Sequence, residues 1–261
     1  MTFSVTGKLK PAFTSNSNGL VITAGSGVGG GAAGNRFDAE ATSGAGGGTV
    51  GVAGSLALDI VNLHTGAILA TSLARGPPHV DSGSSDATLS ATSNSSSTAK
   101  ALPATGTTGS SVGIGASVAL NIVNDETLVS VADGATLTGA NISLTSDSTD
   151  AMTTQATTGA SSPSVAVTPA VAVAISNVTT KVEKNPGPIG APASLTLHAT
   201  QHASAATTAS GSADGGTAAV GASVAITVAN HDVEATTGDV SIPGALSIEA
   251  DGTSSTTTSA T

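Results

Sequence analysis

The chain has 261 residues and a net charge of −10, with only seven Lys and Arg residues, which excludes the basic surface that nucleic acids and anionic lipids require. It has no cysteine, which excludes a disulfide framework and cysteine-ligated zinc, and no apolar run long enough to insert into a membrane. Aromatic residues make up 1% of the chain, so we expect a thin core built from Val, Ile, Leu and Ala.

The first part of the chain, 1–48, is interpreted as an incomplete repeat. Residues 20–48 are similar to the closing part of the units that follow. No apolar segment typical of a signal peptide is seen at the start. Because the last residues are a Ser/Thr run without a capping sequence, we expect the chain to be an internal piece of a longer exported protein.

One segment of 13 residues then recurs four times and always ends in asparagine. It occupies 50–62, 112–124, 165–177 and 218–230, so the closing asparagines lie 62, 53 and 53 residues apart. Larger apolar residues alternate with small or polar ones, which predicts a β-strand with two different faces. We expect Val118, Leu120 and Ile122 to face a thin core, so that Leu120→Asp would unfold the neighbouring unit.

Two further elements follow each copy. In the second unit, 127–139 reads as a strand-like element that contains a turn at Asp133-Gly134. The third element is long and rich in Ser and Thr, and it begins near Thr88, Ser143, Thr196 and Ser247. In its third copy, Leu197 and the alternate residues after it form one face, and His198 and its alternates form the other.

Together these elements predict an all-β fold, a parallel β-solenoid (β-helix) with wide coils of about 53 residues and three strand elements per coil. We expect the partial repeat at 1–48 to be followed by one continuous solenoid over 49–261. Its four stacked β-repeats are placed at about 49–109, 110–162, 163–215 and 216–261. A chain of β-sandwich domains is excluded, because such domains need about 100 residues each.

The recurrent asparagines are the most specific feature of the repeat. Equal positions in stacked coils lie above one another, so Asn62, Asn124, Asn177 and Asn230 are predicted to form a structural ladder. We place that ladder at a corner of the coil, because asparagine tolerates the left-handed backbone of a sharp turn.

The repeat resembles the repeat region of large filamentous bacterial adhesins and haemagglutinin-like exoproteins. The carriers are the block Val-Gly-Ile-Gly-Ala-Ser-Val-Ala-Leu-Asn-Ile-Val-Asn at 112–124 and the block at 129–145, within a resemblance that covers about 50–261. The aromatic residue that family members have near the start of the second block is absent here. The resemblance implies secretion, an extended β-solenoid stalk, and adhesion or matrix building, and it transfers no catalytic residue.

Few residues suggest chemistry. His198 and His202 would lie about 13 Å apart on a strand, too far to share one metal ion, so no metal site is predicted. His64, His79 and His231 are assigned to turns or loops. Asp147 with Asp150, or Asp81 with Asp86, are the candidate carboxylate pairs of a polysaccharide-active β-helix enzyme. We interpret these acids as surface groups, and expect no enzyme and no cofactor.

The favoured function is a structural stalk or display segment of a secreted bacterial adhesin-like surface protein, located outside the cell or on its surface. The expected partners are adjacent repeats or further copies of the chain, with a glycan, host or biofilm surface as a candidate ligand. An ice-binding solenoid is the alternative, because flat arrays of Thr on β-solenoids bind ice in unrelated proteins. Its candidate surface-binding residues are Thr153, Thr154, Thr207 and Thr208.

Overall fold

The computed structural model describes residues 2–9, 19–26, 34–46, 48–71, 76–103, 107–190 and 192–261. Every regular element among them is a β-strand, as the sequence predicts. Part of the segment 1–48 lies outside the described residues. The strands are β1 (Thr2–Leu9), β2 (Leu20–Ser26), β3 (Asn35–Ser43), β4 (Gly48–Leu69), β5 (His79–Asp81), β6 (Ala87–Pro103), β7 (Thr107–Val131), β8 (Thr136–Thr138), β9 (Asn141–Ser162), β10 (Val165–Lys184), β11 (Ile189–Gly190), β12 (Ser194–Gly215), β13 (Ala218–Thr237) and β14 (Ala245–Ala260).

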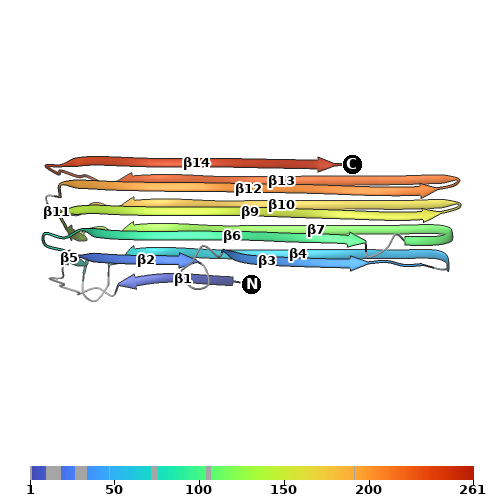
Figure 1. Ribbon diagram of the computed structural model, residues 1–261, viewed down its shortest axis with the longest axis horizontal. Helices are drawn as coiled ribbons and strands as arrows, with labels where there is room; N and C mark the ends of the chain where they lie inside the picture. The colour runs from blue at the N-terminus through green and yellow to red at the C-terminus, as the bar shows by residue number, and fades with distance from the viewer. Residues whose placement is uncertain are drawn as a thin grey trace.

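The long strands form two sets in which neighbours run parallel. The first wall, as we call it, follows the order β1-β4-β7-β10-β13. The second wall has β2 and β3 side by side against β6, followed by β9, β12 and β14. A short pairing between β7 and β9 joins the walls into one sheet of 11 strands, and β5, β8 and β11 form a small separate sheet. Figure 1 shows the strands stacked in sequence order, with the strands of the two walls pointing in opposite directions.

Successive repeats pair residue for residue. In the first wall Asn124 is opposite Asn177 and Asn177 is opposite Asn230, and in the second wall Leu144 is opposite Leu197. Residues at equivalent positions of successive repeats therefore lie in one row across the stack, and the backbone N–H and C=O groups of neighbouring strands are hydrogen-bonded to one another.

The chain reverses at Asp133-Gly134 and not at the asparagines. Strand β7 runs without interruption through Asn124 to Val131, and Gly134 follows in a turn with φ of +71°. The turn predicted at Asp133-Gly134 is confirmed. The corner predicted at the asparagines was wrong, because β7 stays extended through Asn124, where pairing with the equivalent asparagines of neighbouring strands outweighs the preference of asparagine for turns.

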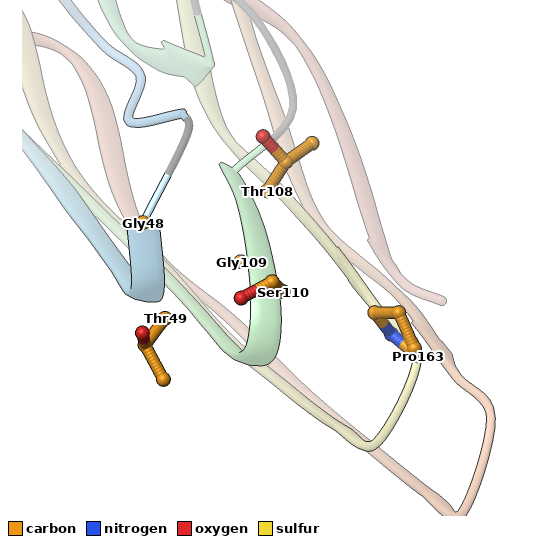
Figure 2. A pocket seen from close by; sticks show the side chains of 6 residues that line it. All are labelled: Gly48, Thr49, Thr108, Gly109, Ser110 and Pro163. Carbon is orange, nitrogen blue, oxygen red and sulfur yellow. The ribbon is translucent and has the colours of Figure 1, made fainter.

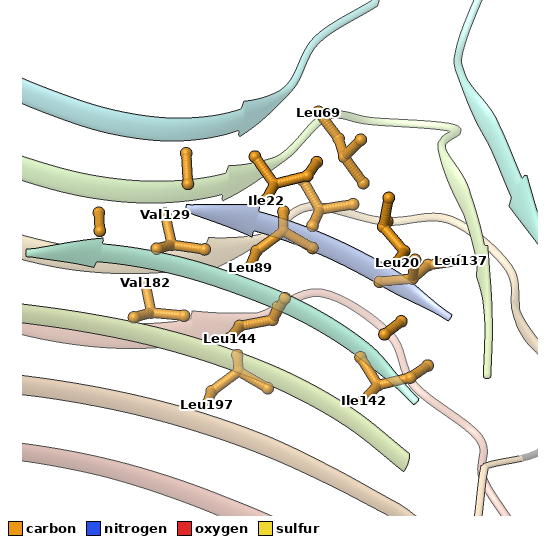
Figure 3. Packing of buried hydrophobic residues seen from close by; sticks show 14 of the residues in the cluster. Leu20, Ile22, Leu69, Leu89, Val129, Leu137, Ile142, Leu144, Val182 and Leu197 are labelled. Carbon is orange, nitrogen blue, oxygen red and sulfur yellow. The ribbon is translucent and has the colours of Figure 1, made fainter. Parts of the chain in front are cut away.

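The largest buried side chains gather at the end of the walls where this turn lies. Leu144 and Leu197 of the second wall pack there against Val129 and Val182 of the first (Figure 3). Leu137 of the short strand β8 closes the same cluster. Leu and Val from both walls exclude water from this end, which makes it the main hydrophobic core.

Beyond a middle cluster that includes Val123 and Met152, the other end of the space between the walls is filled mainly by small residues. Its buried cluster consists of alanines, among them Ala57, Ala119 and Ala172. A Cβ atom added at Gly115 would lie 2.8 Å from the carbonyl oxygen of Gly159 on the opposite wall. The walls approach so closely here that larger side chains do not fit between them.

This narrow interior explains why one expectation about the core was wrong. Val118, Leu120 and Ile122 point away from the second wall, whereas their neighbours Ala119 and Asn121 are fully buried between the walls. The alternation of large and small residues was read correctly as a strand, but the large residues lie outside.

Candidate functional site

The four recurrent asparagines are joined by side-chain hydrogen bonds. Nδ2 of Asn124 donates to Oδ1 of Asn62 over 2.8 Å, Asn177 donates to Asn124 over 2.7 Å, and Asn230 donates to Asn177 over 2.8 Å. Each amide in the middle of the row thus donates to one neighbour and accepts from the other. The row lies on the outer surface of the first wall, half-buried in the inner strands and exposed at Asn230.

The asparagine row divides the outer surface of the first wall into two parts. Toward the start of the strands, the outward residues are those at alternate positions 50–60, 112–122, 165–175 and 218–228. All of them are Val, Leu, Ile, Ala, Gly or Pro. We call this surface the aliphatic face. Ten of its side chains are 39–65% exposed, so it meets solvent as a continuous apolar surface.

On the other side of the asparagine row the same outer surface carries charge. His64 is hydrogen-bonded to Glu126 over 2.8 Å, and Lys181 lies 3.0 Å from Glu234 and 3.2 Å from Asp232. The hydrogen bond to Glu234, followed by that to Asp232, raises the pKa of Lys181. These pairs cover the part of the wall behind which the large Leu and Val side chains are buried.

The outer surface of the second wall is polar along its length. Its outward positions include the Ser and Thr residues of rows such as Thr88, Ser143, Thr196 and Ser247. The two walls therefore present opposite chemistry to solvent, hydroxyl groups on one and aliphatic side chains on part of the other.

The threonines proposed for surface binding do not lie on one surface. Thr153 and Thr208 are exposed on the outer surface of the second wall, but Thr154 and Thr207 are 1% exposed and point between the walls. Thr153 is also opposite Ala206, and Thr208 is opposite Gln155, so the two outward threonines occupy different rows. Placing all four on the surface was wrong, because adjacent residues of a strand point to opposite faces.

Two carboxyl groups meet in the space between the walls. Asp125 of β7 and Asp150 of β9 are 3% and 6% exposed, and their carboxyl groups interact electrostatically, while Asp125 Oδ1 and Asp150 Oδ2 have no hydrogen-bond partner among the described residues. Ser93 Oγ donates to Asp125 over 2.7 Å and Ser95 Oγ donates to Asp150. Asp150 was expected on the surface, paired with Asp147. That expectation was wrong, because Asp150 points inward and Asp147 outward.

Burial controls the protonation of this pair. Loss of hydration, reinforced by the neighbouring Asp125 charge, raises the pKa of Asp150 to about 8, and burial also raises the pKa of Asp125. Asp150 is therefore protonated at neutral pH and can donate its proton to Asp125. No neighbouring residues in the sequence indicate this pair, since its members are 25 positions apart and meet only when the walls face each other.

The other candidate carboxylates stabilise turns and loops. Asp81 Oδ1 accepts a hydrogen bond of 2.9 Å from the backbone N–H of Gly83, within the same turn. Asp86 Oδ1 accepts from both the backbone and the side chain of Asn141, over 3.1 and 2.8 Å. These acids hold the connections between strands.

The histidines occupy strands. His64 lies in β4, His79 in β5 and His231 in β13, so the assignment of all three to turns or loops was wrong. Partial burial lowers the pKa of His231, whose ring nitrogens contact Ser176 and Ser254 over 3.0 and 2.7 Å.

His198 has acidic neighbours that the sequence analysis missed. Its Nε2 lies 3.2 Å from Asp251 and 4.0 Å from Glu249, and these three side chains could hold a metal ion. His202 instead contacts Thr253 over 2.6 Å. Strand β12 pairs in register with β14, so that His198 lies opposite Glu249, 51 positions later in the chain. This pairing brings the acidic residues of β14 next to His198.

A hollow of about 580 Å³ lies where the strands of the first wall begin. It is lined by Gly48, Thr49, Thr108, Gly109, Ser110 and Pro163 (Figure 2). None of these six side chains titrates near neutral pH, so the hollow offers only hydroxyl and backbone groups to a ligand.

Comparisons of this chain with protein-family models, with curated proteins and with solved structures find no match. Among the described residues, no helix is long and apolar enough to cross a membrane.

Proposed function

We propose that this chain is a structural and display segment of a secreted, adhesin-like surface protein, built as a parallel β-solenoid. The observation that supports this most is the residue-for-residue pairing of successive repeats, completed by the hydrogen-bonded asparagine row. Such a stack gains stability from each neighbouring unit and can be extended by adding units, which suits a stalk.

The display role rests on the outer surface of the second wall. Rows of Ser and Thr hydroxyl groups, interrupted by His, Asp and Asn, offer many hydrogen-bond donors and acceptors on a rigid support. Carbohydrates present hydroxyl groups of the same kind, so a glycan is the ligand class that this surface suits best.

Extension of the stack tests the structural proposal. A second copy of residues 110–162 is inserted after Ser162, and its control is an insertion of the same 53 residues in scrambled order. We expect the duplicated protein to melt in one transition, at a higher temperature than the parent, with X-ray scattering showing a particle thicker by about 4.8 Å, one strand spacing. Two separate melting transitions, or a flexible extra segment in scattering, would contradict a continuous solenoid.

A glycan array tests the display role separately. Binding that is lost when Thr153 and Thr208 are changed to Val, but kept when Thr154 is changed to Val, would support recognition through the outer surface of the second wall. An array without any binding would reject the glycan and leave the structural role to the insertion experiment.

A further inference from the structure

The aliphatic face is unusually large for a surface that meets only water. It spans 11 residues along each of four strands, which corresponds to about 36 Å by 19 Å, or roughly 700 Å² on each molecule. Soluble monomers rarely expose a continuous apolar patch of more than about 300–600 Å².

The strands under this face gain little from the interior. The aliphatic face lies over the narrow half of the space between the walls, where the buried residues are alanine, glycine and short polar residues such as Ser117, Asn121 and Thr168. The charged part of the same outer surface lies instead over the large Leu and Val core. Large aliphatic side chains thus lie outside where the interior has no space for them, and their burial requires a second surface.

The face is suited to a copy of itself. Its outward side chains are aliphatic and contain no polar atom, so two such faces can meet without burying an unpaired polar side chain. Its rows also differ in height. A row of Gly54, Ala116, Pro169 and Ala222, three of them Gly or Ala, runs between a row with Ile114 and a row with Leu56. Low and high rows on one molecule allow interdigitation with those on another.

The area also matches a stable complex. Two faces of about 700 Å² bury about 1,400 Å² together, within the range of about 1,200–2,000 Å² found for specific interfaces. A lipid surface fits less well, because acidic residues outnumber the basic ones in the charged border beside the face, where Glu126, Asp232 and Glu234 lie with Lys181, and anionic headgroups repel such a surface.

We propose that two copies of this chain associate through their aliphatic faces, sheet against sheet, and that the hydroxyl-rich second walls point outward on both sides of the dimer. The inference does not depend on the glycan display role or on an extended stack. It identifies the partner as a second copy and the binding surface as positions 50–60, 112–122, 165–175 and 218–228.

Sedimentation velocity of the whole chain over a range of concentrations tests the dimer. We expect a reversible dimer in the wild type, and a dissociation constant raised at least about 100-fold in Val171→Glu, because the charge would be buried at the centre of the interface. The matched control is Thr153→Glu on the opposite wall, which is expected to leave the dimer unchanged. Circular dichroism establishes that each variant is folded.

A second variant guards against a folding defect in Val171→Glu. Changing Leu56, Leu58 and Ile60 to Thr places β-branched residues, which favour a strand, at all three positions while removing the apolar surface, and it is expected to yield a folded monomer. A further control, Ile248→Lys, places a charge on β14 at the end of the stack and is expected to leave the dimer intact.

Three results would overturn the proposal. The first is a wild-type protein that stays monomeric at the highest concentration measured. This result counts against the dimer whether or not the monomer binds phosphatidylcholine vesicles in a flotation experiment. The second is a dimer that survives both aliphatic-face variants. The third is a dimer that only Ile248→Lys disrupts, since the copies would then meet through the open strand edge.

Discussion

Leu120 and Asn121 are neighbours in β7 that point in opposite directions, with the leucine on the outer surface and the asparagine fully buried. The buried amide is supported by a hydrogen bond of 2.7 Å from Ser97 to its Oδ1 and by its own donation to the backbone oxygen of Thr153 over 3.3 Å. In this half of the molecule the polar residue is inside and the apolar residue outside.

The first prediction concerns the opposite faces of β7. Ala119→Asp is expected to lower the free energy of unfolding by at least about 3 kcal/mol, because the charge would be buried among alanines without a partner. Leu120→Asp is expected to change it by less than about 1 kcal/mol in the monomer, because the new carboxylate stays in water. Urea unfolding at low protein concentration measures both variants. Equal losses would show that Leu120 is buried within one chain.

The second prediction concerns the buried acids. Because the folded protein holds the pKa of Asp150 at about 8, above the ordinary value of 3.8, the unfolded chain releases this proton first as the pH rises. The stability contributed by protonated Asp150 is fully present below about pH 4. It then falls by about 1.4 kcal/mol per pH unit until the folded carboxyl also ionises near pH 8.

Replacement of Asp150 removes this pH dependence. Asp150→Asn keeps a donor toward Asp125 without the proton loss, so we expect a higher melting temperature than the wild type at pH 8 and a similar one at pH 4. Thermal unfolding at a series of pH values measures the difference. Asp147→Asn, on the exposed side of the same strand, is the control and should leave the wild-type pH profile unchanged. The prediction fails if Asp150→Asn and the wild type melt in parallel at every pH.

The third prediction concerns the asparagine row. Asn124 takes part in two of its hydrogen bonds and Asn230 in one. At about 0.5–1.5 kcal/mol for each bond, Asn124→Ala is expected to cost about twice as much stability as Asn230→Ala. Chemical denaturation of the two variants gives the ratio, and equal costs would show that the row contributes nothing beyond the packing of each residue.

The fourth prediction concerns the turn. Gly134 has φ of +71°, and a Cβ atom there would lie 3.2 Å from Cγ of Pro77, so Gly134→Ala is expected to cost about 1–2 kcal/mol. The control is Gly159→Ala, because the nearest atom to a Cβ at that position is 3.9 Å away. Differential scanning calorimetry of the pair should show a lower melting temperature for Gly134→Ala alone. A loss of the same size in both would point to a general cost of removing glycine.

Much of the secondary structure could be predicted because strand alternation and repeat spacing are local properties of the sequence. The strands around Leu120 and Leu197, the turn at Asp133-Gly134 and the absence of helices among the described residues all follow from them. The ends of the strands did not follow, because a residue such as Asn124 is compatible with both a corner and an extended backbone. The Asp125–Asp150 contact did not follow either, since it depends on how the two walls face each other.

By itself, the sequence determined which residues share a strand face and which recur at equivalent positions of the repeat. Both follow from the pattern of residues along the chain, namely the two-residue alternation of large and small side chains and the repeat of 53 residues. Only the tertiary structure decided which of the two faces is inside. Alternation places Leu120 and Asn121 on opposite faces but does not say which one meets the other wall. The close approach of the walls at Gly115 decides it, because the narrow space admits alanine, serine and asparagine, and leaves leucine, isoleucine and valine on the outer surface.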